Sequence, residues 1–219
     1  MVEISTSLLS ANKNNIVDTI KELEKAKTNY FHIDVMDGEF VKNDTHDLML
    51  EYSEYLYQIT REPIDIHLMV KDIKNYVDSY KIFQPNIITF HYEACKNKEE
   101  VKELIDYIKT KVRRVGISIK PETPVSEIYE FLPYVHIVLV MTVEPGKGGQ
   151  ILIPETIDKI GELNKYREEN ELNYDIEADG GINLHNSNKL IDAGADILVA
   201  GTAITSSKDY KKTIMDLKH

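Results

Sequence analysis

The sequence predicts an α/β protein built as a single (β/α)8 barrel, or TIM barrel, with a closed eight-stranded parallel sheet. Short apolar runs typical of strands alternate with longer runs in which apolar residues recur every three or four positions, as in helices. Strands followed by helices imply a parallel sheet, and eight such units in 219 residues fit a closed barrel. An open, doubly wound sheet is the structural alternative, but it usually has about six strands and a glycine-rich first turn.

The elements can be assigned in order along the chain. The first helical pattern, over residues 13–27, repeats apolar residues at Ile16, Ile20 and Leu23. Strands are expected over residues 3–8, 30–36, 64–69, 86–91, 114–119, 136–141, 175–178 and 197–200. The other helices are expected over residues 47–60, 73–83, 99–111, 125–132, 154–169, 185–193 and 208–218.

Composition narrows the class of protein. With 42% hydrophobic residues and no linker-like stretch, residues 1–219 are expected to form one domain. A net charge of -11 would repel a phosphate backbone, so nucleic acid is not expected as a partner. No apolar run approaches the ~20 residues of a membrane helix, which predicts a cytoplasmic protein without a membrane partner. Cys95 is the only cysteine, which excludes an intrachain disulfide and a cysteine-based zinc cluster.

The second strand carries the first chemical signal. Side chains alternate between the faces of a strand, so His32, Asp34 and Met36 share one face. A buried carboxylate needs an ion pair, a hydrogen-bond network or a metal ion. For His32 and Asp34 alone, a hydrogen-bonded polar pair is the simpler interpretation.

The barrel interpretation adds further polar residues to this pair. Active sites of such barrels lie at the C-terminal ends of the strands. The polar residues expected there are Ser7, His32, Asp34, His67, His91, Glu144, Asp179 and Thr202. Two imidazoles and two carboxylates among them form a mixed nitrogen and oxygen set that suits Zn(II), Fe(II), Mn(II) or Co(II). A divalent metal site is therefore predicted at His32, Asp34, His67 and Asp179.

Glycine-rich loops follow the last three strands on the same rim. They read EPGKGGQ over residues 144–150, DGG over 179–181 and AGTA over 200–203. Such loops expose backbone N–H groups, and the loops after strands seven and eight of these barrels frequently bind phosphate. One glycine pair alone indicates an ordinary turn, but three on one rim predict a phosphate site.

Seven segments, in chain order, together resemble the ribulose-phosphate 3-epimerase family. They are SLLSA (7–11), HIDVMDG (32–38), IHLMV (66–70), ITFHYEA (88–94), VLVMTVEPG (138–146), EADGGI (177–182) and VAGTAI (199–204). The resemblance implies an isomerase of carbohydrate metabolism that interconverts D-ribulose 5-phosphate and D-xylulose 5-phosphate in the pentose phosphate pathway. Two-base proton transfer would pass through a metal-stabilised enediolate.

The resemblance also implies roles for individual residues. One divalent metal ion per subunit (Zn, Fe(II), Mn or Co), and no organic cofactor, would be bound by His32, Asp34, His67 and Asp179. Asp34 and Asp179 would also be the two acid/base residues. The substrate, a ketose phosphate, would be contacted by Ser7, His67 and Gly146, by the sulfur atoms of Met36, Met69 and Met141, and by a phosphate grip of Gly148, Gly149, Gly180, Gly181, Gly201 and Thr202. A homo-oligomer is expected.

Four positions depart from the family pattern. Glu39 stands where a His is usual, Lys42 and Thr6 where a Pro is usual, and Lys147 where a Phe is usual. Glu39, Lys42 and Lys147 lie in loops that would close on the sugar phosphate, so the preference for a pentulose or a hexulose phosphate stays open. A D-allulose 6-phosphate 3-epimerase, which shares the metal set, is the alternative enzyme. A non-catalytic sugar-phosphate-binding barrel is the alternative of another class, although it would be expected to lose a ligand or a base.

Overall fold

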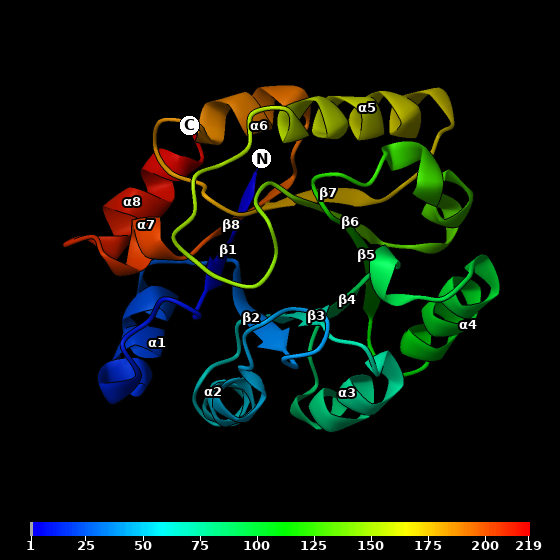
Figure 1. The fold of residues 1–219 in the computed structure, drawn as a ribbon. Coiled ribbons are helices and arrows are strands. Elements are labelled where there is room, and N and C mark those ends of the chain that lie inside the picture. Colours follow the sequence, from blue (N-terminus) through cyan, green and yellow to red (C-terminus); the bar gives the residue numbers. More distant parts are fainter. Residues whose placement is uncertain (1) are drawn as a thin grey trace.

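Eight parallel strands close into a barrel in which each strand pairs with its neighbours in chain order and β8 pairs with β1 (Figure 1). The computed structural model describes residues 2–219. The strands are β1 (Glu3–Ser7), β2 (Tyr30–Met36), β3 (Ile64–Met69), β4 (Ile87–His91), β5 (Arg114–Ile119), β6 (Ile137–Met141), β7 (Asp175–Asp179) and β8 (Ile197–Ala200). The predicted fold class is confirmed, and every predicted strand is right to within one residue at each end.

Helices surround the barrel and connect successive strands (Figure 1). The α-helices are α1 (Ile16–Lys25), α2 (His46–Ile59), α3 (Ile73–Tyr80), α4 (Lys98–Lys109), α5 (Thr156–Glu169), α6 (Ser187–Ala193), α7 (Thr202–Thr205) and α8 (Tyr210–Leu217). The 3-10 helices are η1 (Lys13–Asn15), η2 (Lys81–Phe83), η3 (Tyr92–Ala94) and η4 (Val125–Tyr134). No helix among residues 2–219 combines the length and the apolar character that crossing a membrane requires.

Apart from shifts of up to three residues at helix ends and the unpredicted 3-10 helix η3, the helices differ from the prediction in two places. The segment expected as a helix over residues 125–132 is the 3-10 helix η4, which contains Pro133. Proline lacks an N–H and its ring clashes with the carbonyl four residues earlier, so a regular α-helix is disfavoured there. The short helix α7, for which no bounds were predicted, begins directly after β8.

The strands present different chemistry to their two faces. Along β2, Phe31, Ile33 and Val35 belong to the main apolar core between the sheet and the helices. The intervening His32 and Asp34 point into the barrel. In the parallel register His32 pairs with Asp65 and Asp34 with His67, so these four side chains share the inner face. The strand register therefore gathers polar groups from β2 and β3 inside the barrel.

Candidate metal centre and active site

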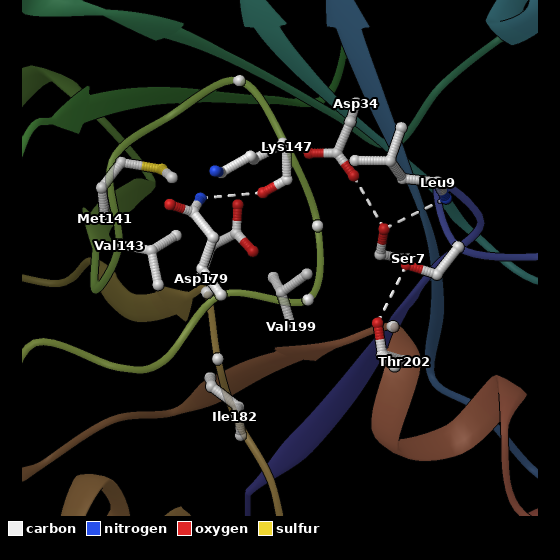
Figure 2. A pocket seen from close by; sticks show the side chains of 18 of the residues that line it. Ser7, Leu9, Asp34, Met141, Val143, Lys147, Asp179, Ile182, Val199 and Thr202 are labelled. Atoms are coloured by element: carbon white, nitrogen blue, oxygen red, sulfur yellow. Dashed lines mark hydrogen bonds between the residues drawn. The ribbon is translucent and has the colours of Figure 1, made fainter.

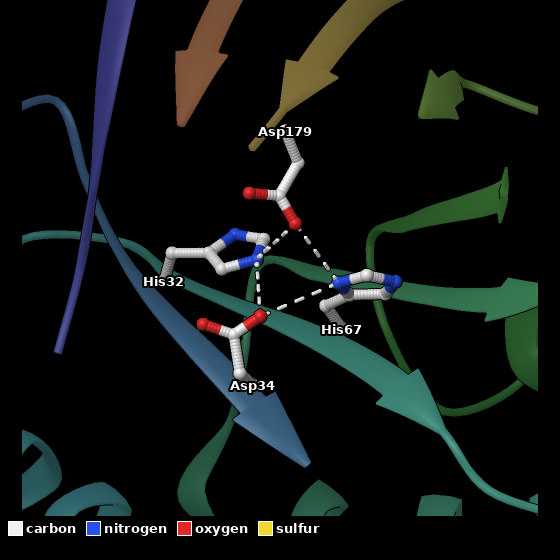
Figure 3. Close-up of side chains that lie close together, drawn as sticks. All are labelled: His32, Asp34, His67 and Asp179. Atoms are coloured by element: carbon white, nitrogen blue, oxygen red, sulfur yellow. Dashed lines mark ion pairs between the residues drawn. The ribbon is translucent and has the colours of Figure 1, made fainter. Parts of the chain in front are cut away.

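Four side chains from β2, β3 and β7 converge at the C-terminal end of the barrel (Figure 3). His32, Asp34, His67 and Asp179 each offer a ligand atom, and these atoms all lie within 4.8 Å of one another. Asp34 Oδ1 lies 3.4 Å from His32 Nε2 and 3.5 Å from His67 Nδ1. Asp179 Oδ2 lies 3.4 Å from the same His67 nitrogen. The sequence prediction that these residues come together is matched by their positions.

The unpaired nitrogens of this cluster fit a metal ion. His32 Nε2 and His67 Nδ1 are buried and have no hydrogen-bond partner in the described chain. A buried polar atom without a partner is costly, and most such atoms in proteins are satisfied. A divalent ion would accept the lone pairs of both nitrogens together with oxygens of Asp34 and Asp179. The cluster therefore has the donor set of a candidate metal centre.

A carboxylate behind His32 orients its ring. His32 Nδ1 lies 2.6 Å from Asp65 Oδ2, and Ser5 Oγ donates to the same oxygen at 2.9 Å. A ring nitrogen that faces a carboxylate carries the proton, so His32 Nε2 keeps its lone pair toward the cluster. Asp65 was not among the site residues predicted from the sequence. Its position two residues before His67, on the same strand face, is the signal that identifies it.

Burial and charge shift the pKa values of the cluster. Burial alone would raise the pKa of Asp34, but the nearby imidazole of His32, and then that of His67, hold this pKa well below its usual value. Burial would lower the pKa of His32, but Asp65 and Asp34 raise it well above 6.5. The buried carboxylates thus attract a positive charge to this point, which a proton or a metal ion can supply.

A cavity of about 280 Å³ opens above the cluster (Figure 2). Of the residues predicted to act in the site, the cavity is lined by Ser7, Asp34, Met36, Met69, Met141, Gly146, Gly148, Gly149, Asp179, Gly180, Gly181, Gly201 and Thr202. His32 and His67 do not line it and are fully buried. Ser7 Oγ donates to Asp34 Oδ2 at 2.7 Å and accepts from the Leu9 N–H at 3.3 Å. Ser7 thereby fixes one carboxylate oxygen at the cavity wall.

The glycine-rich loops form one side of the cavity. At Gly181, with φ +66°, a Cβ atom would lie 2.5 Å from the backbone nitrogen of Leu152, so a side chain does not fit there. Ser10 Oγ and Thr202 Oγ1 lie 3.0 Å apart and link the loop after β1 to the start of α7. The two hydroxyls, whose residues both line the cavity, add polar groups to this wall.

The loop after β6 carries a lysine at the cavity rim. Lys147 is exposed, and the described residues offer it no carboxylate within ion-pair distance. Asn43 Nδ2 donates to the Gly146 carbonyl at 2.7 Å, which ties this loop to the loop after β2. Glu144, expected near the strand ends, does not line the cavity but a neighbouring groove that also contains Lys147.

Some residues of the cavity were not expected from the sequence. Most are apolar or small, and such residues carry no chemical signal before the loops are placed in space. They are Leu9, Ser10, Val143, Gln150, Ile182, Asn183, Val199 and Ala203.

The fold and the four-residue cluster define a (β/α)8 barrel with a candidate metal centre at its C-terminal end. Solved structures share this fold. They include 3-hexulose-6-phosphate synthase from Salmonella typhimurium (TM-score 0.71, 12% identity, 99% of this chain and 96% of that one). KGPDC from Streptococcus mutans has a TM-score of 0.68 at 10% identity, covering 100% of this chain and 96% of that one.

Sequence comparison gives the family. The model of the ribulose-phosphate 3 epimerase family matches residues 3–205. Ribulose-phosphate 3-epimerase of Methanocaldococcus jannaschii is 36% identical over 100% of this chain and 90% of that protein. The Bacillus subtilis protein of the same name is 35% identical over 100% of this chain and 99% of that protein. The chain belongs to the ribulose-phosphate 3-epimerase family, and the names of these two relatives make them carbohydrate epimerases, a class of isomerases.

Proposed function

We propose that this protein interconverts D-ribulose 5-phosphate and D-xylulose 5-phosphate by proton transfer between two carboxylates and the substrate. The observation that carries the proposal is the placement of Asp34 and Asp179 in one cluster at the end of the cavity. They come from β2 and β7, and Figure 3 shows them on two sides of the imidazole pair. Two carboxylates on different sides of a reacting carbon can remove a proton from one face and return it to the other.

The proposed metal ligands are His32, Asp34, His67 and Asp179, holding one divalent ion, Zn, Fe(II), Mn or Co. When bound, the ion would supply Lewis-acid stabilisation of the negative charge that develops on substrate oxygens as the C–H proton leaves. The proposed reaction exchanges only a proton, so no organic cofactor is needed.

Each acid/base residue has one oxygen in the cluster and another outside it. Asp34 Oδ1 and Asp179 Oδ2 face the histidine nitrogens. Asp34 Oδ2 accepts from Ser7, which lines the cavity, so this oxygen is held where a substrate proton can reach it. We assign proton transfer to the outer oxygen of each carboxylate. The Ser7 hydroxyl orients Asp34 for this task and contacts the substrate.

Apolar sulfur atoms and polar loops divide the cavity into two parts. Met36 and Met69 are buried beside Val41 and, with Met141, supply a floor without proton donors. Around the reacting carbon such a floor limits protonation by groups other than the two carboxylates. The opposite part, made by Gly148, Gly149, Gly180, Gly181, Gly201 and Thr202, is the proposed phosphate grip.

The alternatives gain less support. The two relatives are named for ribulose phosphate, and neither name points to a hexulose phosphate. A non-catalytic binding barrel would not need both carboxylates, yet both are present and lie in the cluster. Assembly into a homo-oligomer and a cytoplasmic location stay predictions, and light scattering on the purified protein tests the first of them.

Steady-state kinetics on two substrates test the proposed function. The metal-loaded protein is expected to have a higher kcat/KM for D-ribulose 5-phosphate than for D-allulose 6-phosphate. Treatment with a chelator should abolish activity, and adding back a divalent ion should restore it. A higher kcat/KM for the hexulose phosphate would assign the alternative substrate, and no turnover of either compound by metal-loaded protein would refute the epimerase function.

A further inference from the structure

A second histidine lies behind the candidate metal ligand His67. His67 Nε2 lies 2.9 Å from His91 Nε2, and the two rings stack at a centroid distance of 5.0 Å. On the far side of this second ring, His91 Nδ1 lies 3.1 Å from Glu93 Oε2. Both histidines are fully buried. A continuous chain of hydrogen bonds therefore runs from Glu93 through His91 to the nitrogen of His67 that faces away from the cluster.

The carboxylate at the end of this chain is held in place. Glu93 Oε1 accepts hydrogen bonds from the Lys120 N–H at 2.7 Å and from the Thr123 hydroxyl. Lys159 Nζ donates to the carbonyls of Lys120 and Thr123, at 2.9 and 2.6 Å, and so fixes the turn that carries both donors. With Oε1 occupied by two donors, Oε2 is left for His91.

The direction of the hydrogen bonds follows from this arrangement. A neutral imidazole has one N–H donor and one acceptor nitrogen. Because His91 Nδ1 faces a carboxylate, it carries the proton, and His91 Nε2 becomes an acceptor. His67 Nε2 must then donate, which leaves the lone pair on His67 Nδ1. That nitrogen is the buried atom without a partner at the cluster.

We propose that His91 and Glu93 are positioning residues that fix His67 in the tautomer with its Nδ1 lone pair directed at the metal. The inference rests on the proposed metal centre and adds two residues to it. Asp65 does the same for His32 through a single direct contact. For His67, a second imidazole is inserted between the ligand and its carboxylate, because Glu93 lies on η3, after β4, and His91, the last residue of β4, lies between Glu93 and His67.

The substitution Glu93→Gln gives the sharpest test. Its amide oxygen would continue to accept from Lys120 and Thr123, which turns the NH2 group toward His91 Nδ1. That nitrogen would have to become an acceptor, and the reversed chain would place a proton on His67 Nδ1. When a carboxylate behind a catalytic histidine is changed to an amide, the imidazole takes the wrong tautomer, and catalytic activity is severely reduced.

Metal affinity is measured with Co(II) by competition against a chelator, together with the visible absorption spectrum of the bound Co(II). Glu93→Gln is expected to bind Co(II) about 10- to 100-fold more weakly than the wild type, with an altered spectrum. Glu127→Gln is the matched control, because Glu127 is an exposed carboxylate that accepts from Tyr92 OH, next to His91 in the chain, without touching either histidine. It should bind Co(II) like the wild type.

A double-mutant cycle shows whether the effect passes through His91. In His91→Gln, the amide oxygen can accept from His67 Nε2 without help from Glu93, so adding Glu93→Gln should weaken binding no further. The inference would be overturned if Glu93→Gln weakened Co(II) binding equally in the wild type and in His91→Gln. It would also be overturned if Glu93→Gln kept the Co(II) affinity and spectrum of the wild type. Circular dichroism checks folding. If Glu93→Gln does not fold, Thr123→Val, which removes one of the two donors that hold Glu93 Oε1, replaces it and should also weaken binding.

Failure of the inference and failure of the metal centre give different results. If the wild type and Glu93→Gln bind Co(II) with the same measurable affinity, only the role of the two positioning residues is refuted. Wild-type protein that binds no divalent ion refutes the metal centre, and the inference falls with it.

Discussion

The two faces of the barrel strands differ in chemistry, although they belong to the same short segments. Toward the helices, β2 presents Phe31, Ile33 and Val35, which are fully buried in the apolar core. Toward the barrel axis it presents His32 and Asp34, which are buried as well. Burial of apolar surface stabilises the protein, whereas a buried charge must be paired. The outer face therefore supplies stability, and the inner face holds groups that need a partner.

The inner face also changes along the barrel axis. At the N-terminal end, Tyr30, Ile87, Ile137 and Ile197 form an apolar cluster from the alternate strands β2, β4, β6 and β8. Barrel interiors are usually filled by bulky branched side chains, as they are at this end. Toward the other end, acidic and imidazole groups replace them. The apolar base separates the cluster of candidate metal ligands from solvent on that side and leaves the cavity as its opening.

The largest expected effect comes from removing an inner-face ligand. His67→Ala should lose bound metal and activity together while the barrel stays folded, because the outer apolar core is unchanged. Loss of an outer-shell partner typically costs about 10- to 100-fold in metal affinity, and loss of a direct ligand should cost more. Elemental analysis, an epimerase assay and circular dichroism measure the three properties. Full metal content with normal activity would remove His67 from the site.

The carboxylates on the inner face can be tested separately from the metal. Asp34→Asn and Asp179→Asn, each loaded with metal, should lose turnover by at least the ~10²-fold expected of a missing general acid or base. Asparagine still offers an oxygen to a metal ion, so metal content is measured alongside. Any residual uptake of deuterium from heavy water should be confined to opposite epimers in the two variants.

Two results would contradict this assignment. Both variants could wash deuterium into the same epimer, or either could keep near-normal epimerisation while holding its metal. In each case the two carboxylates would not serve opposite faces of the reacting carbon, and a route with one base would have to replace the proposed one.

Much of the difference between the two strand faces could be predicted from the sequence, because the alternation of side chains within a strand is a local property. The strands and the shared face of His32 and Asp34 follow from their spacing alone. The partners of those residues do not. Glu177 is fully buried on β7, and burial together with Asp65 raises its pKa well above 4.5, but the closeness of β3 and β7 exists only after the barrel closes. The link between His91 and His67 likewise depends on the register of β3 and β4.

A substitution on the outer face should lower the stability of the protein and leave its metal binding unchanged. Ile33 lies between His32 and Asp34 in the chain, but its side chain is fully buried among the apolar residues on the helix side. Ile33→Ala should lower the free energy of unfolding by about 2–5 kcal/mol through lost burial and a residual cavity. Urea unfolding measures this value. The metal content of the folded fraction should stay that of the wild type, and a loss of metal without loss of stability would contradict the division between the two faces.

Acid should act on the inner face, because the outer face has nothing to titrate. Burial lowers the pKa of His91 to about 4, and His67 adds to this effect while Glu93 opposes it. Above the ordinary value of 6.5 this imidazole is neutral in both the folded and the unfolded state. As the pH falls from 6.5 to about 4, the unfolded state takes up a proton that the folded state does not, and this makes a destabilising contribution that grows over the range. Its size is on the order of 3 kcal/mol.

His91→Gln should remove this contribution. Between pH 6.5 and 4, the unfolding free energy of chelator-treated wild type should fall more steeply than that of the variant. Chelator-treated protein is used so that release of metal does not add to the slope. Parallel curves for the two proteins would mean that His91 is not neutral in the folded state.

The smallest expected effect lies at the rim, where neither face of the barrel is involved. Lys147 lines the cavity next to Gly148 and Gly149, and its side chain is exposed to solvent. An exposed ammonium group can make a charge-assisted contact with a phosphate oxygen, but water and salt weaken it. Lys147→Met should therefore raise KM a few-fold at low ionic strength, with little change in kcat, and the difference from the wild type should shrink as salt is added.

Lys21→Met, which removes an exposed lysine from α1 on the outside of the barrel, is the control and should leave KM unchanged. If Lys147→Met keeps the wild-type KM at low ionic strength, the lysine is only a solvated loop residue, and the phosphate is held by the backbone N–H groups and hydroxyls of the three loops.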